Sequence, residues 1–163
     1  MITETVVAFS QAVLRAGADG IFFATQSNAS DFMESEQYAE FGRRHNGPVL
    51  EAIDGVSQFT MLHVCQKNIR FREFVDYPVH AINWDDRITA PSLKEARGLT
   101  DKCLIGGIDK EAVLWKGTPA QVEAQVKDAI ESAGSRKLII GPGCGIPASC
   151  PTENLAGLRR AVK

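Results

Sequence analysis

The chain has 163 residues and a formal net charge of −2, and 44% of its residues are hydrophobic and 23% charged. These values are typical of one globular domain, and without a broad basic surface we expect no nucleic-acid partner. No apolar run reaches the ~18–20 residues of a membrane span, and residues 1–5 lack the basic and apolar regions of a signal peptide. We therefore expect a cytoplasmic protein without membrane contact, whose four cysteines are thiols or metal ligands and not disulfides.

Five short apolar segments predict strands. They cover residues 20–24, 59–64, 78–82, 103–108 and 137–140. Each segment is continuously apolar instead of alternating, which is typical of parallel strands that are covered on both faces.

Amphipathic segments before and between these strands predict helices. The first helix carries Val6 and Phe9 on its apolar face, and the second begins after Ser30 as N-cap and ends at Gly47-Pro48. Residues 49–53 either continue as a helix after that break or make a small extra turn. Thr118-Pro-Ala-Gln121 is the strongest helix start, because it combines a capping threonine, a proline at the first helical position and a glutamine three residues after the cap. Further helices are expected over residues 68–75, 92–99 and 151–162.

The alternation of strands and helices predicts an α/β fold of the (β/α) TIM-barrel type with parallel strands. Five strand–helix units do not close an eight-stranded barrel, and an open half would expose apolar strand edges. Three explanations stay open. A second chain completes the barrel, the sequence belongs to a longer protein, or the sheet remains open and doubly wound.

Two metal-capable side chains close the second predicted strand. His63 and Cys65 are two residues apart, so they point to the same side of a strand. Cys144 follows the last strand in a glycine-rich turn. The functional sites of such barrels lie at the carboxyl ends of the strands, so we predict that these three side chains bind a zinc ion. The alternative is that the cysteines are core residues, because cysteine is among the most buried residue types.

Other polar residues also follow strands and are candidates for catalysis or substrate binding. Asp85 and Asp109 orient substrate or hold a ligand histidine, or they cap the segments that follow them. Gln26 can form a hydrogen bond with substrate, and Gly107, at the end of the strand predicted over residues 103–108, is a further substrate-binding candidate. Trp84 packs against neighbouring loops or stacks on a bound cofactor.

Several segments of this sequence resemble one known family. They are Ala16-Gly-Ala-Asp-Gly-Ile21, His63-Val-Cys65, Ile82-Asn-Trp-Asp-Asp-Arg87, Ile105-Gly-Gly-Ile-Asp109, Gly117-Thr-Pro-Ala-Gln-Val122, Ile140-Gly-Pro-Gly-Cys-Gly-Ile-Pro147 and Thr152-Glu-Asn154. In this order they resemble the C-terminal half of the uroporphyrinogen decarboxylase superfamily. The resemblance implies a single domain over residues 1–163 that lacks the family's N-terminal half.

The resemblance also implies a chemistry. One branch of the superfamily decarboxylates uroporphyrinogen without metal or cofactor. The other transfers methyl groups from cobalamin or another corrinoid, and binds zinc through a His-x-Cys pair and a distant cysteine. His63, Cys65 and Cys144 match the second branch, which implies a zinc-dependent methyltransferase that activates a thiol for methyl transfer from a corrinoid. The family commonly has Gly-Asn-Leu-Asp where this chain has Gly106-Gly-Ile-Asp109, which indicates a different substrate.

Two alternative functions remain beside the methyltransferase. One is a tetrapyrrole decarboxylase of porphyrin biosynthesis, and the other is a non-catalytic half-barrel that binds a partner. The partners implied are a small thiol, a tetrapyrrole or corrinoid, a corrinoid protein, and a second chain that completes the barrel or forms a homo-oligomer.

Overall fold

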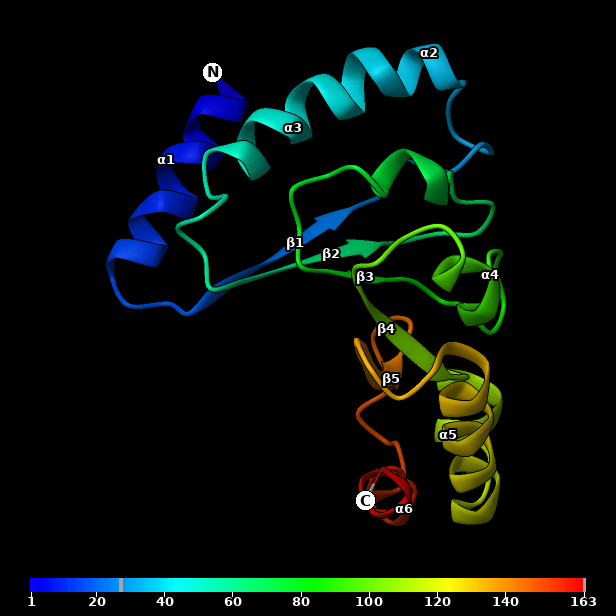
Figure 1. The fold of residues 1–163 in the computed structure, drawn as a ribbon. Coiled ribbons are helices and arrows are strands. Elements are labelled where there is room, and N and C mark those ends of the chain that lie inside the picture. Colours follow the sequence, from blue (N-terminus) through cyan, green and yellow to red (C-terminus); the bar gives the residue numbers. More distant parts are fainter. Residues whose placement is uncertain (27, 163) are drawn as a thin grey trace. The chain divides into compact units, whose positions relative to one another are not determined.

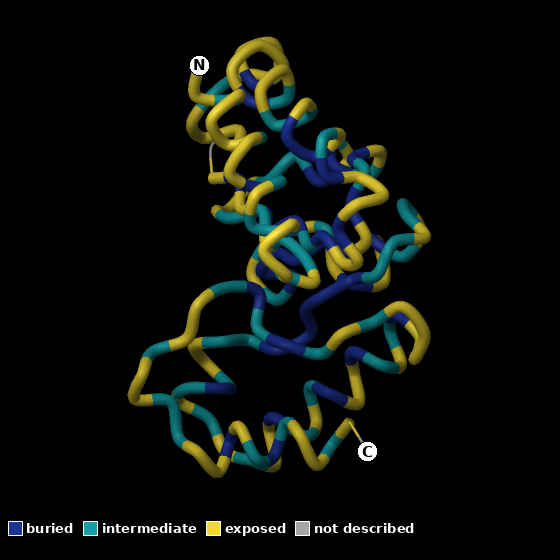
Figure 2. Tube along the Cα trace, turned by 90° about the vertical axis from the view of Figure 1, so that its left-hand side faces the viewer, coloured by how far each residue is buried: buried dark blue, intermediate teal, exposed yellow. Residues whose placement is uncertain are grey.

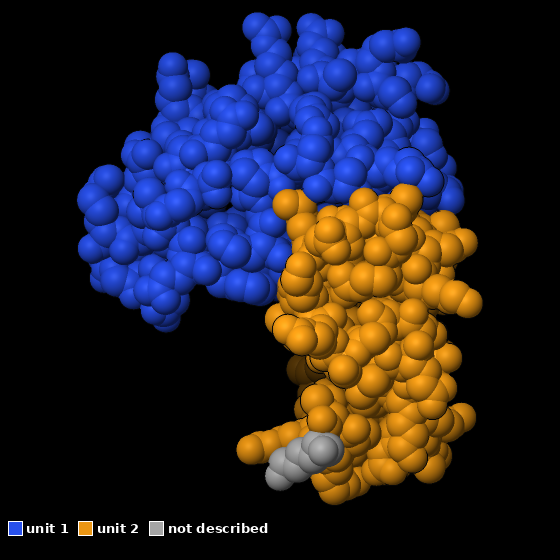
Figure 3. Space-filling model, in the orientation of Figure 1, with its two compact units in different colours: residues 1–82 blue, residues 83–163 orange. Residues whose placement is uncertain are grey.

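The computed structural model describes residues 1–26 and 28–162. The chain forms two compact units, residues 1–82 and residues 83–163 (Figure 3). No helix within the described ranges is long and apolar enough to cross a membrane.

The first unit contains the first strands and the helices between them (Figure 1). Its elements are α1 (Ile2–Arg15), β1 (Gly20–Thr25), α2 (Ser35–Tyr38), the π-helix η1 (Ala39–Arg43), α3 (Arg44–Glu51), β2 (Phe59–Val64), the 3₁₀-helix η2 (Phe71–Phe74) and the start of β3 (Ala81–Asn83). β2 lies between β1 and β3 in the sheet. β1 and β2 run parallel, with Gly20 opposite Phe59 and Thr25 opposite Val64.

The second unit continues the alternation of strands and helices. Its elements are α4 (Leu93–Arg97), β4 (Cys103–Ile108), the π-helix η3 (Lys110–Trp115), α5 (Pro119–Ala133), β5 (Leu138–Pro142) and α6 (Thr152–Ala161). β4 and β5 are parallel, with Leu104 opposite Leu138 and Ile108 opposite Pro142. Helices α4 and α5 pack against β4, and α6 packs against α5. The predicted α/β class is therefore confirmed, with five strands that alternate with helices.

The core of the second unit follows from the helix predicted at Thr118. The threonine side chain accepts a hydrogen bond from the Gln121 N–H, and the Gln121 side chain accepts one from the Thr118 N–H, which is a complete capping box. Starting the helix there turns Val122 and Val126 onto Ile108 of β4, and all three side chains are fully buried. Burial of each such side chain stabilises the fold by roughly 1.5–3 kcal/mol.

The second helical region of the sequence differs from its prediction. Ser30 does not cap a helix, because its hydroxyl donates to the Asn68 carbonyl and the helix begins after Glu34, which forms the capping box. Gly47-Pro48 does not end the helix either, since α3 continues to Glu51 with Pro48 inside it. An interior proline removes a backbone hydrogen bond and crowds the carbonyl four residues earlier. The burial of Val49 and Leu50, which directly follow Pro48, favours the helical path in spite of this cost.

Helix α1 forms as predicted, but its apolar face is only partly covered. Phe9 is 67% exposed and Val6 is exposed, while Ser10 is the one buried residue of the helix. Figure 2 shows the exposed stretches along the trace near the N-terminus. The period of the sequence thus predicted the helix correctly but not which side of it is buried.

Candidate metal centre

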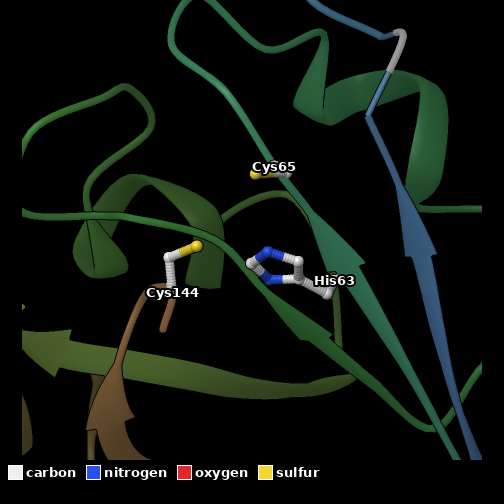
Figure 4. A group of neighbouring side chains, drawn as sticks. All are labelled: His63, Cys65 and Cys144. Carbon is white, nitrogen blue, oxygen red and sulfur yellow. The ribbon is translucent and has the colours of Figure 1, made fainter. Parts of the chain in front are cut away.

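The end of β2 carries the two residues that the sequence singled out. His63 is in the strand and Cys65 follows it directly, so their side chains project from the same side of the chain (Figure 4). One ring nitrogen of His63 and the Sγ atom of Cys65 lie within 4.8 Å of each other. Leu62 and Val64 point to the opposite side and are buried. The strand geometry therefore presents an imidazole and a thiol together.

Aromatic packing fixes the imidazole of His63. His63 is only 8% exposed, and its ring stacks on Phe22 of β1, with the centroids 5.6 Å apart and the planes at 24°. The parallel register places Ala24 opposite His63, so Phe22 lies diagonally across the strand pair on the same face. This contact restricts the rotation of the ring.

Backbone hydrogen bonds fix Cys65. Its N–H donates to the Thr25 carbonyl over 3.0 Å, which extends the β1–β2 ladder by one residue. Its carbonyl accepts a hydrogen bond of 3.4 Å from Nδ2 of the fully buried Asn28. The next residue, Gln66, has φ of 92°, a left-handed conformation that L-residues adopt at a cost. The chain therefore turns sharply immediately after the thiol.

Cys144 lies in the turn after β5, in the second unit (Figure 4). A Cβ atom built on Gly143 would lie 2.1 Å from Cα of Asp85 and 2.5 Å from the Trp84 carbonyl oxygen, so no other residue fits there. The Asn83 amide donates to the Pro142 carbonyl over 3.3 Å. The turn that carries Cys144 is thus held against the end of β3 by close backbone packing.

The donor set of His63, Cys65 and Cys144 fits zinc. Imidazole nitrogen and cysteine sulfur are the ligands that zinc prefers, and three protein ligands leave one coordination position open. All three cysteine and histidine side chains are half-buried or buried, as ligands of a bound metal are. These donor groups are therefore of the kinds that zinc binds.

Asp85 is held by an ion pair. Its Oδ2 atom lies 2.6 Å from Nζ of Lys110, and its side chain is nearly buried. The two residues line a cavity of about 270 Å³ together with Asp109 and Lys116. Lys110 was not among the predicted residues, because a lysine shortly after a strand has no distinguishing sequence signal.

The neighbouring Asp86 serves the packing of β4. Its Oδ1 atom accepts a hydrogen bond of 2.8 Å from the Gly107 N–H, and burial raises the pKa of its carboxyl group above the ordinary value. Gly107 has φ of 97°, and a Cβ there would lie 2.6 Å from Cβ of Ala129. The structure therefore gives Gly107, a predicted substrate-binding residue, a packing reason for being glycine.

Three further predicted residues lie in different environments. Asp109 caps η3, because its Oδ1 accepts hydrogen bonds from the Glu111 and Ala112 N–H groups over 2.9 and 2.8 Å. Trp84 is fully buried, and its Nε1–H group donates a hydrogen bond to the Pro91 carbonyl over 2.8 Å. Of the two roles considered for Trp84, these contacts favour packing against neighbouring loops. Gln26 is exposed after β1.

The two remaining cysteines have structural contacts. Cys103 begins β4 and is half-buried, and burial raises the pKa of its thiol. The Cys150 thiol donates to the Leu114 carbonyl over 3.2 Å and packs on the core of the second unit.

The curated relatives of the chain are methyltransferases. The Methylcobamide:CoM methyltransferase MtbA of Methanosarcina mazei is 28% identical over 159 residues, which are 96% of this chain and 45% of that protein. The Methylcobamide:CoM methyltransferase MtaA of Methanosarcina barkeri is 29% identical over 157 residues, 95% of this chain and 44% of that protein. The chain thus spans less than half the length of the curated relatives it matches.

A solved structure confirms the fold. A methyltransferase from Methanosarcina mazei covers 98% of this chain with a TM-score of 0.83 at 24% sequence identity, and the match is 46% of that protein. The family described as uroporphyrinogen decarboxylase (URO-D) matches residues 1–163 of this chain. The chain therefore belongs to the uroporphyrinogen decarboxylase family.

Proposed function

We propose that the chain is part of a zinc-dependent methyltransferase that transfers a methyl group from a corrinoid to a thiol. The observation that carries the proposal is the pairing of His63 and Cys65, whose ligand atoms lie within 4.8 Å of each other at the end of β2. The relatives support it, because those proteins are named Methylcobamide:CoM methyltransferases.

We propose that His63, Cys65 and Cys144 hold the zinc ion. The ion would supply an open coordination position and lower the pKa of a thiol that enters it, which favours the reactive thiolate. Two cysteine ligands add negative charge around that position. The first strand orients these ligands, because the Phe22 side chain restricts the His63 ring and the Thr25 backbone carbonyl accepts a hydrogen bond from the Cys65 N–H.

We propose a small thiol as the methyl acceptor and a corrinoid as the methyl donor. In the overall reaction the thiol sulfur would form a bond with the methyl carbon, the carbon–cobalt bond of the corrinoid would break with its electron pair left on cobalt, and the thiol proton would be released. The cavity of about 270 Å³ beside Asp85 has room for a small thiol, and Lys110 lines it. We propose that Asp85 and Lys110 orient substrate in this cavity. We propose that Asp109 contributes by capping η3, the helix that begins with Lys110.

A partner is part of the proposal. Phe22 of β1 is 58% exposed and Ile139 of β5 is 44% exposed, although strands of parallel sheets are ordinarily covered on both faces. We propose that another segment of polypeptide supplies the strands that complete the barrel and covers these side chains. Activity would then require that segment.

The non-catalytic half-barrel is the second candidate function, and the same exposed strand residues favour it. A protein of this kind would bind the completing polypeptide without needing zinc. The decarboxylase alternative needs no metal either, so metal content separates both from the methyltransferase.

The deciding experiment is metal analysis by mass spectrometry on protein purified without chelator or histidine tag. We expect about one zinc per chain, and its loss in Cys65→Ser. Cys103→Ser is the matched control, because this half-buried thiol begins β4 and should leave the zinc in place. Absence of metal from the wild-type protein would contradict the proposal and favour the metal-free alternatives.

A further inference from the structure

Asn28 occupies a buried position between the ends of β1 and β2. Its side chain is fully buried, and its Nδ2 atom lies 3.4 Å from the Thr25 carbonyl oxygen and 3.4 Å from the Cys65 carbonyl oxygen. Both partners are acceptors, so the amide nitrogen and not the amide oxygen must face them. Asn28 thus links the last residue of one strand to the residue that carries the thiol.

The contact completes the fixation of the Cys65 backbone. The N–H group of Cys65 is bound by Thr25 and its carbonyl by Asn28, so both of its backbone polar groups have partners in the first strand and the loop that follows it. Gln66 then leaves in a left-handed conformation with φ of 92°. A backbone held on both sides at a sharp turn limits the directions in which the Cys65 side chain can point.

Asn28 is itself held in place by the loop after β2. Arg70 donates from one guanidinium nitrogen to the Asn28 carbonyl over 3.0 Å and from the other to the Met33 carbonyl. Ala29 and Ile69 form an isolated antiparallel bridge between the two loops. The loops after β1 and β2 are therefore tied together, with Asn28 next to the thiol.

We propose that Asn28 is a positioning residue for the metal centre, which holds the Cys65 backbone so that its thiol stands beside His63. The inference rests on the proposed function, since it concerns a ligand of the zinc site proposed there. Residues that orient metal ligands commonly change metal affinity about 10- to 100-fold when they are replaced.

The second unit provides a matched control in Asn154. Its side chain is 1% exposed, and its Nδ2 atom also bridges two carbonyl oxygens, those of Leu114 and Gly117, over 2.9 and 3.0 Å. The amide oxygens of both asparagines are buried without a hydrogen-bond partner among the described residues. Asn28→Ala and Asn154→Ala therefore remove the same kind of contact, and only the first contact involves a proposed ligand.

The test compares zinc affinity and thermal stability in the full chain. Zinc Kd is measured by competition with a chromophoric chelator, and the Co²⁺-loaded protein is examined for its thiolate charge-transfer and ligand-field absorption. We expect both alanine variants to lose thermal stability, but only Asn28→Ala to bind zinc roughly 10- to 100-fold more weakly and to change the Co²⁺ spectrum. Asn28→Ser keeps a hydrogen-bond donor and should recover part of the affinity, which also provides a measurement if the alanine variant does not fold.

The outcomes separate this inference from the proposed function. Equal zinc affinity and equal Co²⁺ spectra in the wild type, Asn28→Ala and Asn28→Ser would overturn the role of Asn28 and leave the zinc site standing. A wild-type protein that binds neither ion would overturn the proposed function and the inference with it. Equal loss of affinity in the Asn28 and Asn154 variants would show a general stability effect and would also overturn the role.

Discussion

The ring of Phe22 stacks on the imidazole of His63 with centroids 5.6 Å apart, although Phe22 is itself 58% exposed. An aromatic contact of this kind contributes about 0.5–1.5 kcal/mol. If it orients the imidazole for metal binding, Phe22→Ala should weaken zinc binding by up to roughly tenfold. The measurement is zinc Kd by chelator competition.

The chain offers a matched control for this prediction. Phe59 is 40% exposed and stacks on His80 in the same way, with centroids 5.7 Å apart and planes at 27°. His80 is not a proposed ligand, so Phe59→Ala should leave zinc affinity unchanged. Equal weakening by the two substitutions would argue against a specific role of Phe22.

The turn before Cys144 should tolerate no side chain at Gly143. Gly143→Ala places a Cβ atom against the backbone of Asp85, and we expect a loss of about 1–3 kcal/mol in the free energy of unfolding. The turn must shift to relieve the overlap, so zinc content should fall as well. Gly145→Ala is the control, because a Cβ there meets no described heavy atom within 4 Å. Thermal melting and metal analysis of both variants check the prediction.

Cys150, which follows Cys144 in the segment between β5 and α6, should not be needed for zinc binding. The Cys150 thiol donates to the Leu114 carbonyl, so Cys150→Ala should cost on the order of 1 kcal/mol of stability and leave zinc content unchanged. Cys144→Ser should instead remove the zinc with little effect on melting of the metal-free protein. Loss of zinc in Cys150→Ala would make Cys150 a ligand and refute this prediction.

The stability of the chain should depend on the ionisation of Asp86. Burial raises the pKa of this carboxyl group above its ordinary value of 3.8, so the folded state binds the proton more tightly than the unfolded state. The contribution of Asp86 to stability should therefore fall as pH rises from near 3.8 through the raised pKa of the folded state, and stay low at higher pH.

Asp86→Asn tests this pH dependence. The amide oxygen can still accept the hydrogen bond from the Gly107 N–H, but the group carries no charge. The difference in Tm between the variant and the wild type should move in favour of the variant as pH rises. A difference in Tm that does not change between about pH 4 and pH 8 would contradict the raised pKa.

Much of the fold followed from local patterns. The strands over residues 59–64 and 103–108 formed with the predicted bounds, because continuous apolar runs between turn residues leave few alternatives. The helix at Thr118 formed as predicted because its capping box lies within four residues. The end predicted at Gly47-Pro48 was wrong, because burial of the following turn is a tertiary effect that local signals do not contain.

The sequence by itself determined the alternation of strands and helices and the pairing of His63 with Cys65. Both depend on the two-residue period of a strand and the apolar content of short segments, which are local properties. Only the tertiary structure revealed that Asn28 binds the Cys65 carbonyl and that Lys110 pairs with Asp85. These partners lie 37 and 25 residues apart along the chain, and contacts over such separations depend on how the loops fold back and not on any local pattern.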